Sequence, residues 1–335
     1  MTTGRIHLNV AEARALGEAA LRGVGYNEEE ARIVCDHCLD AALCGYEYSG
    51  LAKILNVPES PHFKKPRRPI APLRETPVSL ALDGGNNVGM LALYYAAEAT
   101  IRIADTQGIA LVSVHDAWMS GRAAYYVEMI ARQGLVAIHS TGAQPHVAPF
   151  GGTTKVLGTN PLAIAIPSSK GPIILDIGTS AFMMTELMLR ERLGDELPEG
   201  VALGPNGAPT RNPTLARQGA LLPFGGPQGG YKGFGLSLMM QALGLLAGAG
   251  ATEASDYGYL FIAFKPDLIG PAQVFDARVG ELIDRIKASP RQADVDEIRI
   301  PSERSSRTRE RLLVEGIEID QLVFDQLEAL AQDAR

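Results

Sequence analysis

Apolar residues recur at helical spacing in the first part of the chain. Two short patterns, Asn9 to Glu12 and Asn27 to Glu30, each place an asparagine three positions before a glutamate. In such a capping box, each side chain hydrogen-bonds to the backbone N–H of the other residue, which starts a helix. Apolar positions follow the boxes, mostly three or four apart: Ala13, Leu16, Ala20 and Leu21, then Ala31, Val34, Cys38 and Ala41. We therefore predict two helices, which end near Gly23 and Gly45.

A proline-rich, basic segment separates this region from the rest of the chain. Six prolines lie from Pro58 to Pro77. Proline fixes φ and has no backbone N–H, so a segment with so many prolines seldom forms a packed element. We predict a linker or arm here.

After position 78, helical periodicity alternates with short apolar runs. Helix-like Met90 to Gln107 precedes the run Ile109 to Val114, and helix-like Arg122 to Gln133 precedes Leu135 to Ile138. Further strand-like runs are Ala163 to Ile166, Ile173 to Ile177 and Tyr257 to Phe264, and amphipathic stretches close the chain at Phe275 to Ala288 and Ile319 to Ala331. This alternation predicts an α/β fold built around a sheet.

Composition and charge narrow the class of function. The chain has 335 residues and is 46% hydrophobic, which suffices for a large core and roughly two domains. The net charge of −7 argues against a nucleic-acid-binding surface, which needs a basic stripe. The most apolar stretch, Gly233 to Gly250, contains polar residues and glycines, which indicates a buried helix rather than a membrane span. No apolar leader follows the N-terminus, so we expect a cytoplasmic protein.

The three cysteines, Cys35, Cys38 and Cys44, lie close together, near His37 and Asp40. All five side chains fall on one predicted helix or its end, and one helix cannot surround a metal ion tetrahedrally. An odd, clustered set of cysteines is also a poor disulfide framework and suits a reducing compartment. We predict buried structural cysteines and no metal site.

A glycine-rich segment from Phe224 to Gly235 is the first candidate for binding chemistry. Glycines allow a backbone to approach a phosphate closely, a helix N-terminus favours anions, and Lys232 adds a positive charge. The segment is not a P-loop, because Gly233 follows the lysine, and no Gly-x-Gly-x-x-Gly opens an early strand–helix unit. We predict a loop that runs into a helix, and either an anion site or an ordinary turn remains open.

Two turns with small polar residues follow apolar runs. In Leu157 to Pro161, the asparagine before proline is held out of the helical region, and Thr159 and Asn160 offer hydrogen bonds. Leu175 to Ser180 similarly ends a strand-like run with small polar residues. Ligands of α/β proteins bind at the carboxyl ends of strands, so both turns are candidate binding positions, although each also has a plain structural interpretation.

Taken together and in order, these segments resemble the malate/L-lactate dehydrogenase family. That family also includes diketogulonate, ureidoglycolate and sulfolactate enzymes and cyclic imino acid reductases. The matching stretches are Tyr125-Tyr126, Gly134, Ala148 to Gly152, Gly158 to Pro161, Asp176 to Ser180, Pro198 to Gly200, Tyr231 to Gly235 and Ile300 to Arg304.

The resemblance implies an α/β, L-sulfolactate-dehydrogenase-like, non-Rossmann NAD(P)-binding domain and a homodimer. It divides the chain into an N-terminal helical region (1–75), the cofactor domain (76–265) and a C-terminal region (266–335) that packs with the N-terminal helices. NAD or NADP would contact Met119, Ser120, Gly121, Arg122, Ala123, Asp176, Gly178, Thr179, Ser180, Tyr231, Lys232, Pro301 and Arg304. Arg307 is a further candidate for a cofactor phosphate.

The sequence differs from the family motif at the position of the histidine that serves as the general acid. The family motif Gly-Ile-Asp-Ser-His-Gly corresponds here to Gly45 to Gly50, so the histidine falls on Ser49. The arginine that would hold a substrate carboxylate falls on Lys53, and a second common histidine falls on Met119. Lys53 and Thr159 are therefore the predicted substrate-binding residues.

Reduction of a ketone needs a proton, because hydride addition leaves an alkoxide. The serine hydroxyl of Ser49 is a weak acid. Tyr48, with its pKa lowered by a nearby cation such as Lys53, and His146 are therefore the alternative candidates for the catalytic acid. A protonated cyclic imine would need no donor, and Glu186 is a candidate to stabilise its charge. We predict an NAD(P)H-dependent reductase of a small 2-oxo carboxylate, with a cyclic 2-imino acid reductase or a non-catalytic ligand-binding relative as alternatives.

Overall fold

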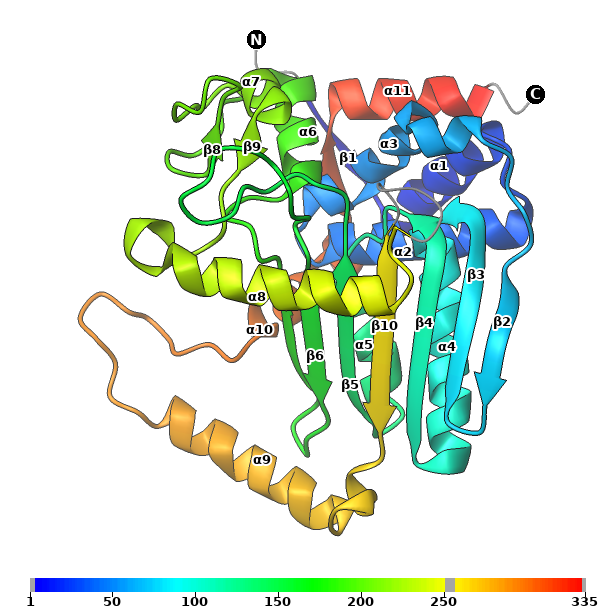
Figure 1. The fold of residues 1–335 in the computed structure, drawn as a ribbon, viewed down its shortest axis with the longest axis vertical. Helices are drawn as coiled ribbons and strands as arrows, with labels where there is room; N and C mark the ends of the chain where they lie inside the picture. Colours follow the sequence, from blue (N-terminus) through cyan, green and yellow to red (C-terminus); the bar gives the residue numbers. More distant parts are fainter. Residues whose placement is uncertain (1–3, 251–256, 333–335) are drawn as a thin grey trace.

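The computed structural model describes residues 4–250 and 257–332, and it has a helical layer packed on a central sheet (Figure 1). The described sheet has seven strands. Their spatial order is β2 (Ala71–Thr76), β3 (Ser79–Val88), β4 (Ile109–Trp118), β10 (Gly258–Phe264), β5 (Val136–Gly142), β6 (Leu162–Ile166) and β7 (Ile173–Ile177). Strands β3 and β4 are parallel, and every other neighbouring pair is antiparallel. The predicted α/β class is confirmed.

Helices cover both faces of this sheet (Figure 1). On one face lie α4 (Gly89–Gln107) and α5 (Ala123–Ala131), and on the other lies α8 (Gly226–Leu246). The aromatic side chains of Tyr126 and Phe261 are fully buried between α5 and the sheet. Burial of large aromatic surfaces stabilises this contact, so α5 and the turn that precedes it have a fixed position over the strands.

The two ends of the chain form the helical layer together. Strand β1 (Arg5–Leu8) pairs with β11 (Ile317–Asp320), and α1 (Val10–Gly23) packs on α11 (Gln321–Gln332). Helices α2 (Glu28–Leu43) and α10 (Glu303–Glu315) complete the layer. Both predicted capping boxes are present, with each asparagine and glutamate bonded reciprocally. The three cysteines are buried and free of disulfides.

A small cap lies beside the sheet and has a hydrophobic core of its own. It contains α6 (Met184–Leu193), α7 (Pro213–Gln218) and the short strands β8 (Ala202–Leu203) and β9 (Ala220–Leu221). Leu187 and Leu221 are fully buried in this core. The cap is therefore a separate packed unit that lies beside the helical layer (Figure 1).

Two predictions from the glycine and proline content are wrong. Residues 71–76 of the proline-rich segment form the edge strand β2, where proline is tolerated because one side of the strand lacks a partner. The segment Phe224 to Gly235 is not a loop, since α8 already begins at Gly226. Its glycines permit close packing: a Cβ at Gly233 would collide with the backbone of Phe224, and one at Gly244 with that of Gly142. Tertiary packing thus outweighs the weak helix propensity of glycine.

Helix α8 is also less buried than its composition predicts, because Leu238, Met239, Leu245 and Leu246 are exposed.

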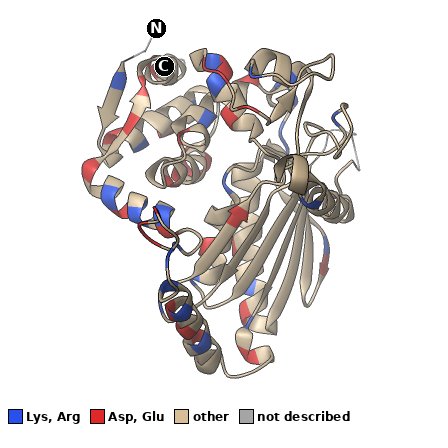
Figure 2. Cartoon of the chain, turned by 90° about the vertical axis from the view of Figure 1, so that its left-hand side faces the viewer, with Lys and Arg blue, Asp and Glu red and all other residues tan. Residues whose placement is uncertain are grey.

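No helix within the described ranges has the length and hydropathy needed to cross a bilayer. Acidic and basic residues both occur on outer helices such as α9 (Ala272–Lys287), whereas the strands of the sheet carry few charged residues (Figure 2).

The C-terminal region has two parts with different surroundings. Helix α10, β11 and α11 pack with the N-terminal helices, but α9 (Ala272–Lys287) lies at the opposite end of the sheet (Figure 1). There Lys170 pairs with Asp284, and the Ser169 hydroxyl donates to the Asp276 carbonyl. The proposed domain limits at 75 and 265 stay a prediction.

A prediction concerns the contact between α10 and the other two layers. Arg309 donates to Asp40 of α2 at 2.9 Å and to Glu128 of α5 at 2.6 and 3.0 Å. Arg309→Met should lower the free energy of unfolding by about 2–3 kcal/mol, because two poorly exposed carboxylates lose a charged donor. Urea denaturation measures this change.

Arg311→Met is the matched control on the same helix, since Arg311 forms an exposed pair with Glu315. That variant should change stability by less than about 0.5 kcal/mol. Equal losses in the two variants would show that Arg309 does not connect the layers.

Candidate functional site

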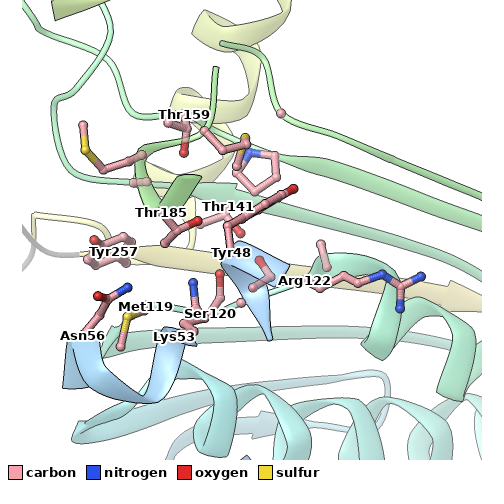
Figure 3. A pocket seen from close by; sticks show the side chains of 18 of the residues that line it. Tyr48, Lys53, Asn56, Met119, Ser120, Arg122, Thr141, Thr159, Thr185 and Tyr257 are labelled. Carbon is pink, nitrogen blue, oxygen red and sulfur yellow. The ribbon is translucent and has the colours of Figure 1, made fainter. Parts of the chain in front are cut away.

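A cavity of about 810 Å³ lies where the helical layer, the sheet and the cap meet (Figure 3). It brings together most of the residues singled out from the sequence, although they come from distant segments. Those that line it are Tyr48, Ser49, Lys53, Met119, Ser120, Gly121, Arg122, Ala123, His146, Thr159, Asp176, Gly178 and Pro301. The sequence motifs therefore meet at one place.

Some predicted residues lie outside the cavity wall. Thr179 and Ser180 are buried next to it, where the Thr179 hydroxyl donates to the Thr159 carbonyl and the Ser180 hydroxyl to the Phe182 carbonyl. They position the turns rather than face the cavity. Tyr231 and Lys232 lie on an exposed part of α8 and do not line the cavity.

The turn from β4 into α5, residues 119–123, forms one side of the cavity. Its backbone is held from two directions: Arg122 N–H donates to His37 Nε2 at 2.8 Å, and Ala124 N–H donates to Asp176 Oδ2 at 2.7 Å. Gly121 has φ of +79°, and a Cβ there would collide with the imidazole of His37. The turn thus needs glycine at position 121 and a neutral His37 that can accept.

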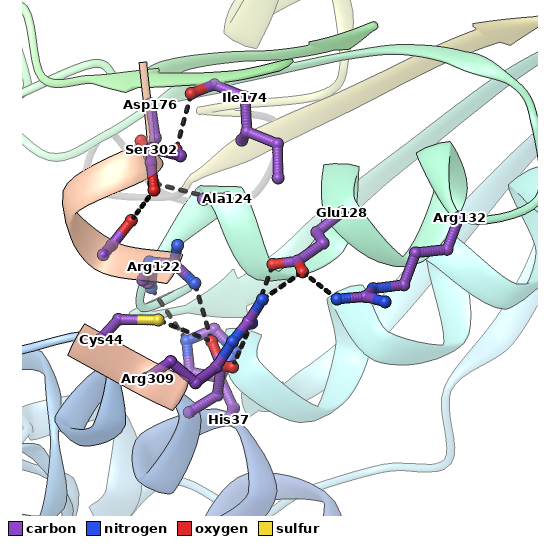
Figure 4. A network of polar contacts seen from close by, with 12 residues as sticks. His37, Cys44, Arg122, Ala124, Glu128, Arg132, Ile174, Asp176, Ser302 and Arg309 are labelled. Atoms are coloured by element: carbon purple, nitrogen blue, oxygen red, sulfur yellow. Dashed lines mark hydrogen bonds and ion pairs between the residues drawn. The ribbon is translucent and has the colours of Figure 1, made fainter. Parts of the chain in front are cut away.

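The guanidinium of Arg122 belongs to a network of charged groups beside the cavity (Figure 4). It donates to Asp40 at 2.7 Å, and Asp40 also accepts from Arg309, which in turn binds Glu128. Because its charge is already balanced by Asp40, Arg122 positions the turn more than it attracts a ligand.

Lys53 has no such partner. Its side chain, on η2 (Leu51–Leu55), is 3% exposed and points into the cavity (Figure 3). Among the described residues no carboxylate forms an ion pair with it, and burial lowers the pKa of Lys53 to about 8. A buried ammonium without a counter-charge favours an anionic ligand.

The two acids expected from the sequence have unsuitable environments. Burial raises the pKa of Tyr48, and Glu186 and Asp176 raise it further. Arg122 opposes this rise but has a smaller effect, so the expected net lowering of the pKa by a cation is wrong. Burial, with smaller effects of Lys155 and Arg217, lowers the pKa of His146 to about 4. At neutral pH both side chains are therefore uncharged, and neither readily supplies a proton.

Asp176 lies on the opposite side of the turn. Burial raises the pKa of this carboxyl, while the Ala124 N–H and the nearby Arg122 oppose the rise. Its hydrogen bond to the first turn of α5 shows that it caps this helix. Asp176 therefore has a structural role whatever else it does.

Several lining residues were missed by the sequence analysis. His62 lies in the proline-rich segment that was predicted to be an arm, yet its ring stacks on Trp118 with centroids 5.8 Å apart. The Gln144 amide nitrogen lies 3.0 Å from His62 Nε2. Three methionines from the start of α6, Met183, Met184 and Met188, line the cap side. A single histidine after a proline forms no sequence pattern, so the place of His62 in the cavity wall could not be predicted.

The N-terminus of α10 also opens onto the cavity, and it is the strongest candidate for binding phosphate. Pro301 and Ser302 line the wall directly before this helix. Arg304, in its first turn, has no ion pair among the described residues and lies 5.3 Å over the Tyr46 ring. Arg307, by contrast, is paired with Glu297 at 2.8 Å. A free arginine at a helix N-terminus suits an anion.

The described residues contain no group of three or more histidine, cysteine or acidic side chains that could hold a metal ion.

Comparisons with known proteins agree with this geometry. A family model described as malate/L-lactate dehydrogenase matches residues 8–328. A malate dehydrogenase of Pyrococcus abyssi is 35% identical, covering 93% of this chain and 90% of that protein. A Delta(1)-pyrroline-2-carboxylate reductase of Ancylobacter novellus is also 35% identical, covering 97% of both chains. The solved structure of sulfolactate dehydrogenase from Methanocaldococcus jannaschii has a TM-score of 0.84 and 31% identity, covering 98% of this chain and 97% of that one.

A prediction concerns the turn that forms the cavity wall. Gly121→Ala should combine backbone strain at φ of +79° with a collision against His37. Gly134→Ala is the matched control, because Gly134 has φ of +77° but no described atom within 4 Å of the new Cβ. We expect about 1 kcal/mol of destabilisation in the control. The Gly121 variant should lose about 1–3 kcal/mol more.

Chemical denaturation of both variants measures the difference. Equal destabilisation would mean that His37 shifts without cost and that the Arg122–His37 hydrogen bond does not fix the turn.

Proposed function

The chain belongs to the malate/L-lactate dehydrogenase family, and on that basis we propose that it is an NAD(P)H-dependent reductase that converts a small 2-oxo carboxylate to the 2-hydroxy acid. The observation that carries this proposal is Lys53, a buried ammonium without a counter-charge in the cavity. The carboxylate of a 2-oxo acid supplies the charge that Lys53 lacks.

The residues present fit a nicotinamide dinucleotide. Its phosphates are assigned to the α10 N-terminus with Arg304, where a free cation and helix N–H groups meet. The assigned position of the nicotinamide is the turn Met119 to Ala123, close to Lys53 in the same cavity. When bound, this cofactor supplies the hydride. A cavity of about 810 Å³ is large enough for an extended cofactor part and a small substrate.

The other walls are suited to holding a small acid. The hydroxyls of Thr141 and Thr159 line the cavity on the side of the sheet and its turns (Figure 3). The methionines of α6 give an apolar wall that adapts to different side chains. We assign Lys53 and Thr159 to substrate binding. Ser49 is 6% exposed and lines the same cavity, and we assign it to orientation of the substrate rather than proton transfer.

A cyclic 2-imino acid is the second candidate substrate. One relative at 35% identity is a pyrroline-2-carboxylate reductase, and Glu186 lies close enough to Tyr48 to raise its pKa. Glu186, however, is paired with Arg190 at 3.2 Å, which weakens its ability to stabilise an iminium. A non-catalytic ligand-binding protein remains the third alternative.

The experiment that tests the function is a substrate panel with both cofactors. Oxidation of NADH and NADPH is followed with pyruvate, oxaloacetate, 2-oxoglutarate and the five- and six-membered cyclic imino acids. We expect turnover of at least one 2-oxo acid, with kcat/KM within the usual enzymatic range of about 10⁴–10⁸ M⁻¹s⁻¹.

Cofactor fluorescence titration runs in parallel as the control for folding and binding. Turnover of imines alone would favour the second candidate. Cofactor binding without any turnover would instead favour the ligand-binding alternative.

We also propose that two copies of the chain form a homodimer through α8. Tyr231, Leu238 and Leu245 are exposed and seven positions apart, so they lie along one face of the helix, and Met239 and Leu246 flank them. An apolar stripe of this length seldom faces water in a monomer. Because Tyr231 and Lys232 do not line their own cavity, we propose that any contact they make with the cofactor crosses between the two copies.

A prediction follows for the oligomeric state. The double variant Leu245→Glu and Leu246→Glu replaces side chains that are 61% and 77% exposed, and it should convert a dimer to a monomer because charges would be buried in the interface. Size-exclusion chromatography with light scattering measures the mass.

Val314→Glu is the control, since Val314 on α10 is 88% exposed and lies outside the stripe. It should leave the mass unchanged. A wild-type monomer, or a dimer in the double variant, would contradict the α8 interface.

A further inference from the structure

Lys53 differs from an arginine in one chemical property that matters in this cavity. Both side chains carry a positive charge, but only the lysine ammonium can release a proton near neutral pH. The sequence resemblance implies a separate histidine acid and arginine clamp, whereas this chain has Ser49 and Lys53 at those positions. Lys53 is therefore a candidate both for binding the substrate carboxylate and for donating the proton.

We propose that Lys53 is the proton donor of the reduction, as well as the group that binds the substrate carboxylate. This inference rests on the proposed function, the reduction of a 2-oxo carboxylate. In such a substrate the carbonyl and carboxylate oxygens are attached to adjacent carbons. An ammonium has three N–H groups, so it can donate to both oxygens at once.

The proton and electron pairs balance with the reduced nicotinamide as the reductant. The carbonyl carbon receives the hydride, and the π electron pair of the C=O bond moves to the oxygen, which takes a proton from Lys53 Nζ. The products are the 2-hydroxy carboxylate, the oxidised nicotinamide and a neutral lysine amine. Water returns the proton to the amine before the next turnover.

The groups around Lys53 leave its ammonium free to act. On α2, burial together with Lys53 and Arg122 lowers the pKa of His37, which stays neutral. On the same helix, burial raises the pKa of Cys38 to about 12, so the thiol is uncharged. Tyr48 of η1 (Glu47–Ser49) is neutral as well, because burial raises its pKa. No described residue of α1, α3 (Asn56–Glu59) or α11 has a charged interaction with Lys53.

The remaining acids of the cavity are less suitable. The pKa of His146 is lowered to about 4 by burial, so the ring carries no spare proton at neutral pH. Asp176 accepts from the Ala124 N–H, which uses this carboxylate as a helix cap. His62 is a competitor, but its ring is stacked on Trp118 and Nε2 is occupied by Gln144. Burial lowers the pKa of Lys53 to about 8, which is close to the optimum for a general acid.

The main experiment is Lys53→Arg, assayed on the best 2-oxo acid from the panel. Arginine keeps the charge that binds the carboxylate but cannot give up a proton. We expect KM to change less than about threefold and kcat to fall roughly 10²–10⁴-fold, the range for loss of a general acid. Retained kcat in this variant would overturn the proposal and leave Lys53 as a carboxylate clamp.

The pH dependence gives a second readout. The donor form is the protonated ammonium, which is present below the pKa and is lost as pH rises through about 8. For wild type, kcat/KM for reduction should therefore be level below pH 8 and fall tenfold per pH unit above it, while oxidation of the 2-hydroxy acid should rise over the same range. The arginine variant should have no such transition, and a wild-type profile that stays level to pH 10 would overturn the proposal.

A binding measurement tests the ammonium without catalysis. Oxamate, an unreactive analogue of a 2-oxo acid, is titrated calorimetrically against the cofactor-loaded protein from pH 6.5 to pH 10. Its affinity should weaken above about pH 8 in wild type and stay constant in Lys53→Arg. Constant affinity in wild type would show that Lys53 does not titrate in the cavity.

Three controls separate the possible failures. Lys170→Arg makes the same exchange at an exposed ion pair far from the cavity and should leave kcat and its pH profile unchanged. A large loss of kcat in His62→Gln, with Lys53→Arg unaffected, would identify His62 as the donor instead. If Lys53→Arg fails to fold, Lys53→Ala is assayed with added methylamine: restored kcat supports the proposal, and no restoration in a folded variant contradicts it.

The substrate panel tests the proposed function, whereas Lys53→Arg tests only the donor role. No turnover of any substrate would refute the proposed function itself. Turnover of 2-oxo acids that survives Lys53→Arg would refute only the donor role, and turnover restricted to cyclic imines would refute it too, because an iminium needs no donor.

Discussion

Two backbone hydrogen bonds fix the turn between β4 and α5, and the cavity depends on both. The Arg122 N–H donates to His37 of the helical layer, and the Ala124 N–H donates to Asp176 at the far edge of the sheet. Residues 37, 122 and 176 thus meet at one turn although they are far apart in sequence. His37 can accept only while its ring is neutral, and burial together with the charges of Lys53 and Arg122 keeps it so.

The two cations of the cavity, Arg122 and Lys53, differ in whether a carboxylate balances their charge. Arg122 is held by Asp40, which also binds Arg309, so its charge is balanced within the protein. Lys53 lies against neutral neighbours, His37 and Cys38, and has no balancing carboxylate among the described residues. Burial of an unpaired ammonium costs free energy, which is why its pKa falls. A bound anion would recover part of that cost, and we therefore propose Lys53, rather than Arg122, as the site of the substrate carboxylate.

Local signals predicted local structure well. The capping boxes at Asn9 and Asn27 start α1 and α2, and the apolar run Ile173–Ile177 coincides with β7, because capping and alternation depend on neighbouring residues. The start of α8 could not be predicted from its glycines, since close packing on Phe224 and Gly142 decides it. The positions of His62 and the burial of Lys53 depend on segments far away in sequence, and no short pattern encodes them. The order of the motifs predicted which residues line the cavity. It did not predict the pKa values of the groups inside it, because these depend on burial.

A single lysine in place of a histidine and an arginine also bears on the choice between ketone and imine. In the proposed mechanism, the ammonium lies beside the carbonyl oxygen that becomes negative, which stabilises the transition state for a ketone. A protonated cyclic imine would instead place its positive nitrogen next to Lys53, and two like charges in a buried site repel each other. The neutral amine would tolerate such a substrate, but below about pH 8 it is the minor form. After proton transfer to a ketone, the lysine is uncharged and holds the product carboxylate less tightly than it held the substrate, which favours release of the hydroxy acid.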